Sequence, residues 1–404
     1  MVKLLISLRA EIVQRRNDLP MVKQRDSMGT NSRSTRSESA RLAPLDMLRG
    51  LLIVLMAIDH ASFFVAQQHS GEYWGGGLPS YADALPFLTR LVTHLAAPGF
   101  FFLMGVGMAL LAYARQQQGW SRWAILRHFW LRGALLIVLK FLLVNRAWEL
   151  AAGSWGLQVY AGVLFGLGAA MLLGSLLLEV KPGYLFLLAL ALAVGTELWT
   201  PAPGAWGYPA PVLVRLLLLP GGDQSLWVTY PVLPWLGLAA FGIGFGHWLV
   251  KDTRKTLDRA LTLGVAFLAL FVVLRALNGF GNIRPQAGNT WIDFLNVVKY
   301  PPSITFSLLT MSINLILLWL FAQVGTRVQR YLRPLAVFGQ SPLFFYVTHL
   351  FLYMALGRLL TPHGTTILQM YPYWLLGLLM LYPLCLAYGR LRQRQPAHSL
   401  LRLF

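Results

Sequence analysis

Residues 304–324, ITFSLLTMSINLILLWLFAQV, contain no side chain that ionises at neutral pH. A run of about twenty apolar residues is what an α-helix needs to cross the hydrocarbon core of a bilayer. Residues 51–58 and 98–114 are similarly free of charged groups. One such run also fits a buried helix of a soluble protein, but their recurrence in one chain predicts a multi-pass integral membrane protein.

The composition of the whole chain supports this interpretation. Of 404 residues, 56% are apolar and 12% are charged, whereas soluble domains average about 25% charged residues. The formal net charge is +19, but ten basic residues precede Leu51 and most others fall in short loops. This distribution is typical of cytoplasmic anchoring on anionic lipid, not of nucleic-acid binding. The single cysteine, Cys385, excludes an internal disulfide and a cysteine-based metal cluster, and we expect no metal site.

The hydropathy pattern predicts an all-α bundle of about ten transmembrane helices. They are expected near residues 45–67, 85–114, 123–143, 156–179, 183–199, 230–250, 259–277, 303–324, 337–358 and 371–390. Strongly basic loops alternate with sparsely charged ones across these spans, which predicts that both termini are cytoplasmic. The chain is therefore expected in the cytoplasmic (inner) membrane, with the lipid bilayer as its first partner.

Three segments are expected along the chain. The stretch from about Asn17 to Arg41 is polar and rich in serine and arginine, which predicts that residues 1–40 are a disordered basic cytoplasmic tail. Residues 41–394 form the transmembrane domain, and residues 395–404 form a short cytoplasmic tail. A homo-oligomer is compatible with this organisation.

A few ionisable side chains fall inside the predicted spans, where a charge is costly and therefore informative. Asp59 and His60 lie in the outer half of the first helix, His94 in the outer part of the second, and His349 near the middle of the ninth. Histidine acts as a general base, a nucleophile or a metal ligand. Consecutive helical residues point about 100° apart, so Asp59 is expected to serve a neighbour other than His60, either His94 or an arginine. Structural histidines bonded to backbone carbonyls are the alternative.

The tract FLNVVKYPPS, residues 294–303, contains two prolines that stop an incoming helix and pre-set the next one. They hold Asn296, Lys299 and Tyr300 at the outer surface, where a lysine meets a phosphate, a carboxylate or a developing oxyanion. The alternative role is an interfacial anchor. Tyr230 opens a similar proline-rich entry to the sixth helix.

Two groups of charged residues near helix ends have simpler interpretations. Arg122, Arg127 and Arg132 line a cytoplasmic helix entrance and form a basic funnel suited to the phosphates of acyl-CoA, although topology alone also explains them. Lys140 and Glu197 are expected to snorkel, because long side chains near helix ends reach the membrane interface.

Several motifs follow one another in order along the chain. They are RLAPLDMLRG (41–50) leading into MAIDH (56–60), HLAAP (94–98) with FFFLMG (100–105), Tyr230-Pro231 with Pro234-Trp235, KYPPS (299–303), and Gly339 with Tyr346 and His349. This ordered set resembles the bacterial branch of the heparan-alpha-glucosaminide N-acetyltransferase catalytic-domain family, over roughly residues 41–390.

The resemblance implies a multi-pass acyltransferase. Lysosomal members of the family use cytosolic acetyl-CoA to acetylate a terminal glucosamine across the membrane, with a histidine as acceptor or base. His60 and His94 lie within matching motifs and are the candidate chemical residues, with Asp59 beside them. The loop 67–84 departs from the lysosomal pattern, which makes His69 a third candidate and argues against heparan as the acceptor.

These inferences predict transfer of an acyl group, acetyl in the first instance, from acyl-CoA to an amine or hydroxyl of an envelope sugar or glycolipid. Acyl-CoA is a co-substrate, and no permanently bound cofactor is expected. The rival class is a transporter or lipid flippase, which an intramembrane Asp/His set fits equally well. The residues expected to bind the acceptor are Arg49, Tyr230, Asn296, Lys299, Tyr300 and His349.

Overall fold

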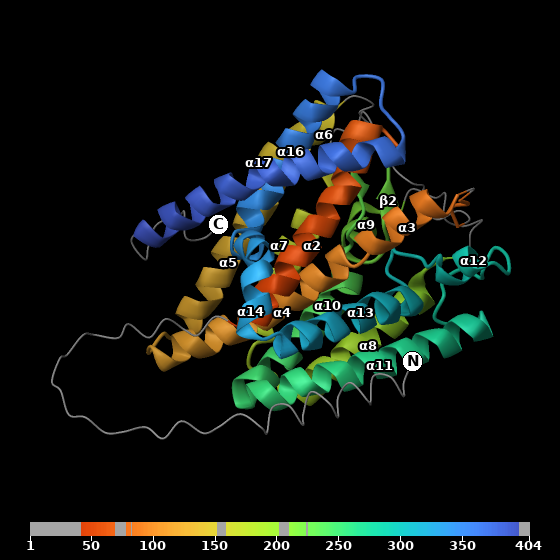
Figure 1. Cartoon of the computed structure of the whole chain (residues 1–404). Helices are drawn as coiled ribbons and strands as arrows, with labels where there is room; N and C mark the ends of the chain where they lie inside the picture. Colours follow the sequence, from red (N-terminus) through yellow and green to blue (C-terminus); the bar gives the residue numbers. More distant parts are fainter. Residues whose placement is uncertain are drawn as a thin grey trace. The chain divides into compact units, whose positions relative to one another are not determined.

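The structure is a computed structural model that describes residues 42–68, 78–81, 83–151, 159–201, 210–223 and 225–395. The expected tail 1–40, most of the expected tail 395–404, and His69 lie outside these residues. The regular secondary structure of the described residues is helical apart from three two-residue strands, so the expected all-α class is confirmed (Figure 1).

Among the described residues, nine helices are long and apolar enough to cross a membrane. They are α2 (Ala43–Ala61) with the π-helical turn η1 (Ser62–Ala66), α3 (Ala84–Thr93) with α4 (Ala96–Gln117), α5 (Arg122–Leu139) with the π-helical turn η2 (Lys140–Val144) and α6 (Asn145–Glu149), α8 (Pro182–Trp199), α10 (Val232–Lys251), α11 (Thr253–Leu277), α13 (Ile304–Gln323), α16 (Pro342–Leu360) and α17 (Ile367–Arg394). The expected span 156–179 is the shorter α7 (Val163–Leu176), because the chain first forms the strand β1 (Tyr160–Ala161). The chain is a multi-pass integral membrane protein.

The remaining elements are short and join these helices. They are α9 (Val212–Leu217), β2 (Gly221–Gly222), β3 (Trp227–Val228), α12 (Trp291–Leu295), α14 (Thr326–Tyr331) and α15 (Arg333–Gln340). In the small sheet, β3 pairs parallel with β1 and antiparallel with β2.

Prolines divide two of the expected spans. The span 85–114 breaks into α3 and α4 at His94–Leu95, because a proline ring collides with the carbonyl four residues earlier, and Pro98 stands four residues after His94. The span 337–358 breaks at Ser341, immediately before Pro342, and α15 precedes the break. His94 is therefore at a junction between two helices rather than within a continuous one.

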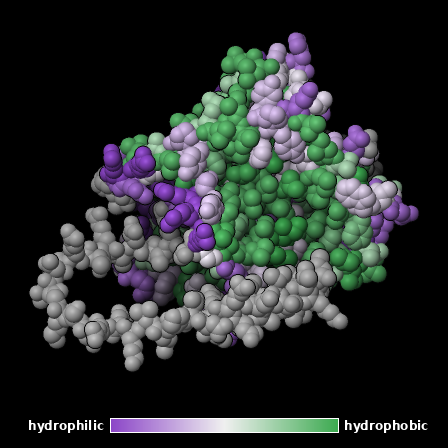
Figure 2. All heavy atoms as spheres, viewed as in Figure 1, coloured by the Kyte–Doolittle hydropathy of each residue, from purple (hydrophilic) through white to green (hydrophobic). Residues whose placement is uncertain are grey.

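Glycines set the closest helix packing in the bundle. The central helix α10 packs against α4, α7, α8 and α11. A Cβ atom at Gly242 of α10 would lie 2.1 Å from the carbonyl oxygen of Phe102 in α4. Small residues are what allow membrane helices to approach so closely. Outside this core, Figure 2 shows a broad band of apolar side chains at the surface, with hydrophilic side chains toward its margins.

The two ends of the bundle differ in chemistry. The basic end carries the connections after α4, α7, α10 and α13, and there Arg122 pairs with Glu179 at 3.3 Å. The loop end carries the segments before α3 and between α11 and α13, and there Asn296 Nδ2 donates to Pro79 O at 2.7 Å. We expect the basic end to face the cytoplasm.

Candidate functional site

Two histidines from distant parts of the chain form a hydrogen-bonded pair inside the bundle. His60 Nδ1 lies 2.6 Å from His349 Nε2, and His349 Nδ1 lies 2.8 Å from Phe345 O. A carbonyl only accepts, so His349 Nδ1 carries a proton and, in the neutral ring, His349 Nε2 is an acceptor. His60 Nδ1 must then donate to it, which leaves the lone pair of neutral His60 on Nε2. This tautomer is suited to take a proton or attack a carbonyl.

Aromatic rings enclose the histidine pair. His60 is 7% exposed and His349 is fully buried. The rings of Trp148 and Tyr346 contact His60 edge-on, with centroids 5.6 and 6.1 Å away. The π-helical turn η1 follows His60 directly, and its Phe63 ring lies 4.6 Å from that of Trp148. Such turns interrupt α-helices frequently at functional sites, and here they deliver an aromatic wall around the pair.

A cavity of about 340 Å³ reaches from the basic end toward this pair. Its polar lining is Asp46, Arg49, Arg132, Gln340, Tyr346 and Arg392. Its apolar walls come from one face each of α4, α5 and α7, and include Phe100, Leu103, Met104, Met108, Phe129, Leu136, Leu164, Leu167 and Met171. Tyr346 both lines the cavity and contacts the two histidine rings, so the cavity and the histidine pair are parts of one site.

The motif around Arg49 positions this side chain at the cavity. Arg49 donates to Asp46 Oδ1 at 2.7 Å and to Gly339 O at 3.0 Å. A Cβ atom at Gly339 would lie 2.0 Å from Asp46 O, and one at Gly50 would lie 1.8 Å from Leu335 O. The two glycines therefore bring α2 and α15 into backbone contact, and Arg49 spans that contact.

Tyrosines cluster at the loop end, on the far side of the histidine pair from the arginines. The hydroxyls of Tyr230 and Tyr300 lie 3.1 Å apart, and Thr229 Oγ1 donates to the Tyr160 hydroxyl at 3.3 Å. Trp148 links this cluster to the pair, because its ring contacts both Tyr160 and His60. Burial raises the pKa of the Tyr160 phenol to about 12 and that of Tyr230 further still. These hydroxyls remain protonated donors at neutral pH.

Two buried lysines border the tyrosine cluster. Lys299 is 4% exposed, and its Nζ lies 4.8 Å from the centroid of the Tyr300 ring. Lys140 is fully buried, donates to Asn145 Oδ1, and places Nζ 4.1 Å from the centroid of the Tyr160 ring. The expectation that Lys140 snorkels to the interface is wrong, because the π-helical turn η2 directs its side chain inward.

Asp59 pairs with an arginine, which is one of the two partners expected from the sequence. Arg90 of α3 donates to Asp59 Oδ1, and the side chain of Arg90 is 3% exposed. The pair acts on the tyrosine cluster, since both residues contribute to the pKa values of Tyr160 and Tyr230. Near the end of α8, the carboxylate of Glu197 accepts from the backbone N–H groups of Ile283 and Ile304 at 3.0 and 2.9 Å.

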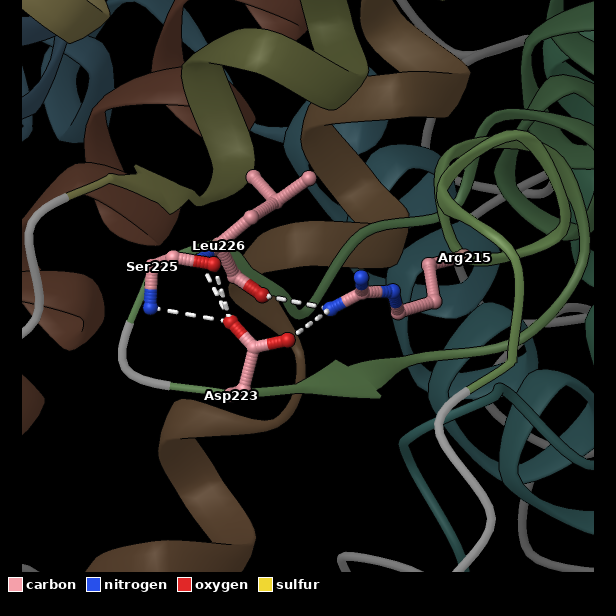
Figure 3. A network of polar contacts seen from close by, with 4 residues as sticks. All are labelled: Arg215, Asp223, Ser225 and Leu226. Carbon is pink, nitrogen blue, oxygen red and sulfur yellow. Dashed lines mark hydrogen bonds and ion pairs between the residues drawn. The ribbon is translucent and has the colours of Figure 1, made fainter.

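A polar turn holds the strand that leads to Tyr230 (Figure 3). Asp223 accepts from the backbone N–H groups of Ser225 and Leu226 at 2.9 and 3.1 Å, and Arg215 donates to Asp223 and to Leu226 O. The Ser225 hydroxyl and these N–H groups lower the pKa of Asp223 to about 2. The carboxylate of Asp223 therefore stays ionised, and keeps these hydrogen bonds beside β3, until the pH falls toward this pKa.

The structure separates the other residues predicted for the site. His94 is buried at the α3–α4 junction with its ring 5.5 Å from that of Phe306, while the partner of His60 is His349. Arg132 lines the cavity, whereas Arg122 pairs with Glu179 and Arg127 is exposed. The described residues contain no group of three His, Cys, Asp or Glu side chains arranged for a metal.

Sequence reasoning missed several residues of this arrangement, including Trp148 and Tyr160. Arg90 and Lys140 each carried a usable signal, an ionisable group inside or at the end of a predicted span. Arg392 carried none, because it is one of several arginines at the end of α17. Tyr346 was recognised only as part of a motif, and its position one turn before His349 gives it a role at the site.

The fold and this arrangement define a polytopic membrane protein with a buried histidine pair between an arginine-lined cavity and a tyrosine–lysine cluster. The profile of the family described as heparan-alpha-glucosaminide N-acetyltransferase, catalytic, matches residues 41–278, more than half of the chain. The chain therefore belongs to this family and carries a membrane acetyltransferase-type domain. A comparison with curated protein sequences finds no match. The motifs at 299–303 and 339–349 lie beyond the matched stretch.

Proposed function

We propose that the protein transfers an acyl group, acetyl in the first instance, from acyl-CoA at the cytoplasmic face to an amine or hydroxyl of an envelope sugar or glycolipid. The observation that carries this proposal is the continuity of the site. The cavity begins among three arginines and ends at Tyr346, which touches the His60–His349 pair. A chemical group buried within the bundle is thereby connected to a polar mouth at the basic end.

The donor fits the cavity by its chemistry. Guanidinium groups bind phosphates through paired N–H donors, and Arg49, Arg132 and Arg392 supply them at one end. The apolar walls beyond suit a pantetheine arm. On α2, residues 46, 49, 53, 56 and 60 follow one another at intervals of three and four and so share one helix face. The rise of a helix places His60 about 16 Å beyond Arg49, and an extended pantetheine arm spans a distance of this order.

The chemistry uses the lone pair on His60 Nε2. As a base, it takes the proton of the acceptor amine or hydroxyl while the acceptor attacks the thioester carbon, the C–S bond breaks, and CoA leaves as the thiolate. As a nucleophile, Nε2 itself forms the bond to the acyl carbon and expels the CoA thiolate. The acceptor then attacks the acyl carbon, the C–Nε2 bond breaks, and the proton of the acceptor passes to Nε2. In both cases the imidazolium is stabilised by the hydrogen bond from His60 Nδ1 to His349.

The acceptor is assigned to the loop end. Lys299, Tyr300, Tyr230 and Asn296 are buried there, and Trp148 connects the cluster to His60. The protonated tyrosine hydroxyls donate to sugar oxygens or to the oxyanion that forms at the acyl carbon. The position of the histidine pair between two polar regions supports entry of the donor and the acceptor from opposite ends.

Transfer across a sealed membrane tests the proposal. Proteoliposomes are loaded with glucosamine, acetyl-CoA is added outside, and the N-acetylated product is measured by mass spectrometry together with release of the CoA thiol. We expect product that depends on both substrates. Proton-coupled flux of the sugar without acetyl-CoA, and without acetylation, would identify a transporter instead. Mass spectrometry of envelope glycans from cells with and without the gene then identifies the natural acceptor.

Replacement of Arg132 is expected to weaken donor binding selectively. Loss of one charged hydrogen bond to a phosphate is worth about 1.5–3 kcal/mol, so Arg132→Met should raise KM for acetyl-CoA by at least about tenfold, with kcat little changed. Arg127→Met is the matched control, because Arg127 lies on the same helix but is exposed. Equal KM values in the two variants would remove Arg132 from the donor site.

A further inference from the structure

The loop end holds a buried lysine, Lys299, which is 4% exposed. Among the described residues Lys299 forms no ion pair with a carboxylate, and its Nζ lies over the ring of Tyr300. A buried ammonium is costly unless it is paired. Burial lowers the pKa of Lys299 well below its usual range, and the Arg90 guanidinium lowers it further, more strongly than Asp59 raises it. Among the described residues, Lys299 therefore has no carboxylate that compensates its charge.

Three carboxylates of the described part of the loop end are already engaged. Asp59 pairs with Arg90, and Glu197 accepts two backbone N–H groups. Asp293 accepts from Thr290 in the capping box that starts α12. Lys140, the second buried cation beside the tyrosine cluster, is bonded to the neutral amide of Asn145. Within the described residues, positive charge at the loop end exceeds the negative charge available to it.

We propose that the acyl acceptor carries a phosphate or a carboxylate, and that this anion binds at Lys299 beside the hydroxyls of Tyr230 and Tyr300. This inference rests on the proposed function only in that it takes the bound ligand to be the acyl acceptor. An anion at Nζ supplies the missing partner and restores the ammonium form of the lysine. One of the two tyrosine hydroxyls, 3.1 Å apart, donates to the other, so the pair has one further donor proton, and a charged acceptor is held by a charge and by a hydrogen bond.

An anion-binding role and a catalytic-base role for Lys299 require different charge states of its side chain. A base needs a neutral amine, which arginine does not provide, whereas an anion site needs a cation, which arginine retains. Lys299→Arg therefore keeps the preference for an anionic ligand, and Lys299→Met loses it. The exposed Lys255 at the start of α11 gives a matched control, Lys255→Met.

The test compares two probes that differ by one phosphate group, glucosamine and glucosamine 6-phosphate, with protein in phosphatidylcholine nanodiscs and without acyl-CoA. We expect wild type and Lys255→Met to bind the phosphate at least about tenfold more tightly. That ratio should fall close to one in Lys299→Met and largely persist in Lys299→Arg. Equal affinity of wild type for both probes would overturn the proposal, as would an unchanged ratio in Lys299→Met. If Lys299→Met does not fold, wild type and Lys299→Arg still decide the question.

A second arm separates a soluble anion from a lipid headgroup. In nanodiscs of phosphatidylglycerol, a headgroup source is indicated if the lipid competes with glucosamine 6-phosphate in wild type but not in Lys299→Met. Absence of competition assigns the anion to the sugar. Because no donor is present, failure of the charge preference is distinguishable from failure of acyl transfer, which is measured separately with neutral glucosamine.

Discussion

His60→Ala should reduce acyl transfer by about 10²–10⁴-fold, the range in which a positioned general base or acid contributes. The change removes the Nε2 lone pair that the proposed reaction uses. His349→Ala should also reduce the rate strongly, because His60 then loses the acceptor that fixes its tautomer. The rate of product formation under saturating acetyl-CoA is the measurement.

The double variant gives the sharper result. If the two histidines act as a unit, His60→Ala/His349→Ala is no slower than His60→Ala alone, because the effects of such residues are not additive. His247→Ala is the control, since His247 lies on α10 at the basic end and does not line the cavity. Undiminished transfer by His60→Ala would remove the pair from the reaction. Loss of transfer in His94→Ala but not in His60→Ala would move the chemistry to the α3–α4 junction.

Trapping distinguishes the two roles of His60. An acylated imidazole reacts rapidly with hydroxylamine, so incubation with radiolabelled acetyl-CoA in the absence of acceptor labels the wild-type protein only if Nε2 carries the acyl group. The label should be absent from His60→Ala and released by hydroxylamine. An unlabelled wild-type protein that still catalyses transfer assigns the residue as a base.

The spans were predictable from sequence because hydropathy over about twenty residues is a local property. The observed helices differ from the predicted spans where a single residue or a single strand pairing overrides the average hydropathy. Pro98 breaks a span that hydropathy predicts as continuous, and β1, which pairs with β3, shortens the expected helix 156–179 to α7. The π-helical turns η1 and η2 left no local signal of this kind, although η2 determines that Lys140 points inward.

The site was predictable as a set of residues but not as an arrangement. The ionisable groups at membrane depth drew attention to Asp59, His60 and His349, and the structure places His60 beside His349. Depth alone favoured His94 as the neighbour of His60, because both lie near the outer side of consecutive helices. The observed partner is 289 residues away, and only the packing of α16 against α2 brings it there. Figure 1 shows this convergence, with the C-terminal α16 and α17 beside the N-terminal α2.

Arg90 has the largest expected effect on stability. Its side chain is 3% exposed and pairs with Asp59, whose side chain is 21% exposed. Removal of one partner from a buried pair costs about 3–5 kcal/mol, because the other charge remains buried without compensation. Since Asp59 keeps some contact with the surface, Arg90→Met should lie near the lower limit, about 3 kcal/mol. The free energy of unfolding is measured by titrating the protein in mild detergent with a denaturing detergent.

Two further variants separate the ion pair from simple loss of packing. Asp59→Asn/Arg90→Met removes both charges and should recover much of the lost stability, since replacing a whole buried pair is often nearly neutral. Arg146→Met provides the exposed comparison, because Arg146 pairs with Glu149 at 2.5 Å with 63% of its side chain accessible. Its effect should stay below about 1 kcal/mol, as for other surface pairs. If the double variant is as unstable as Arg90→Met, the arginine stabilises the bundle by packing, and Asp59 is available to the acceptor rather than committed to Arg90.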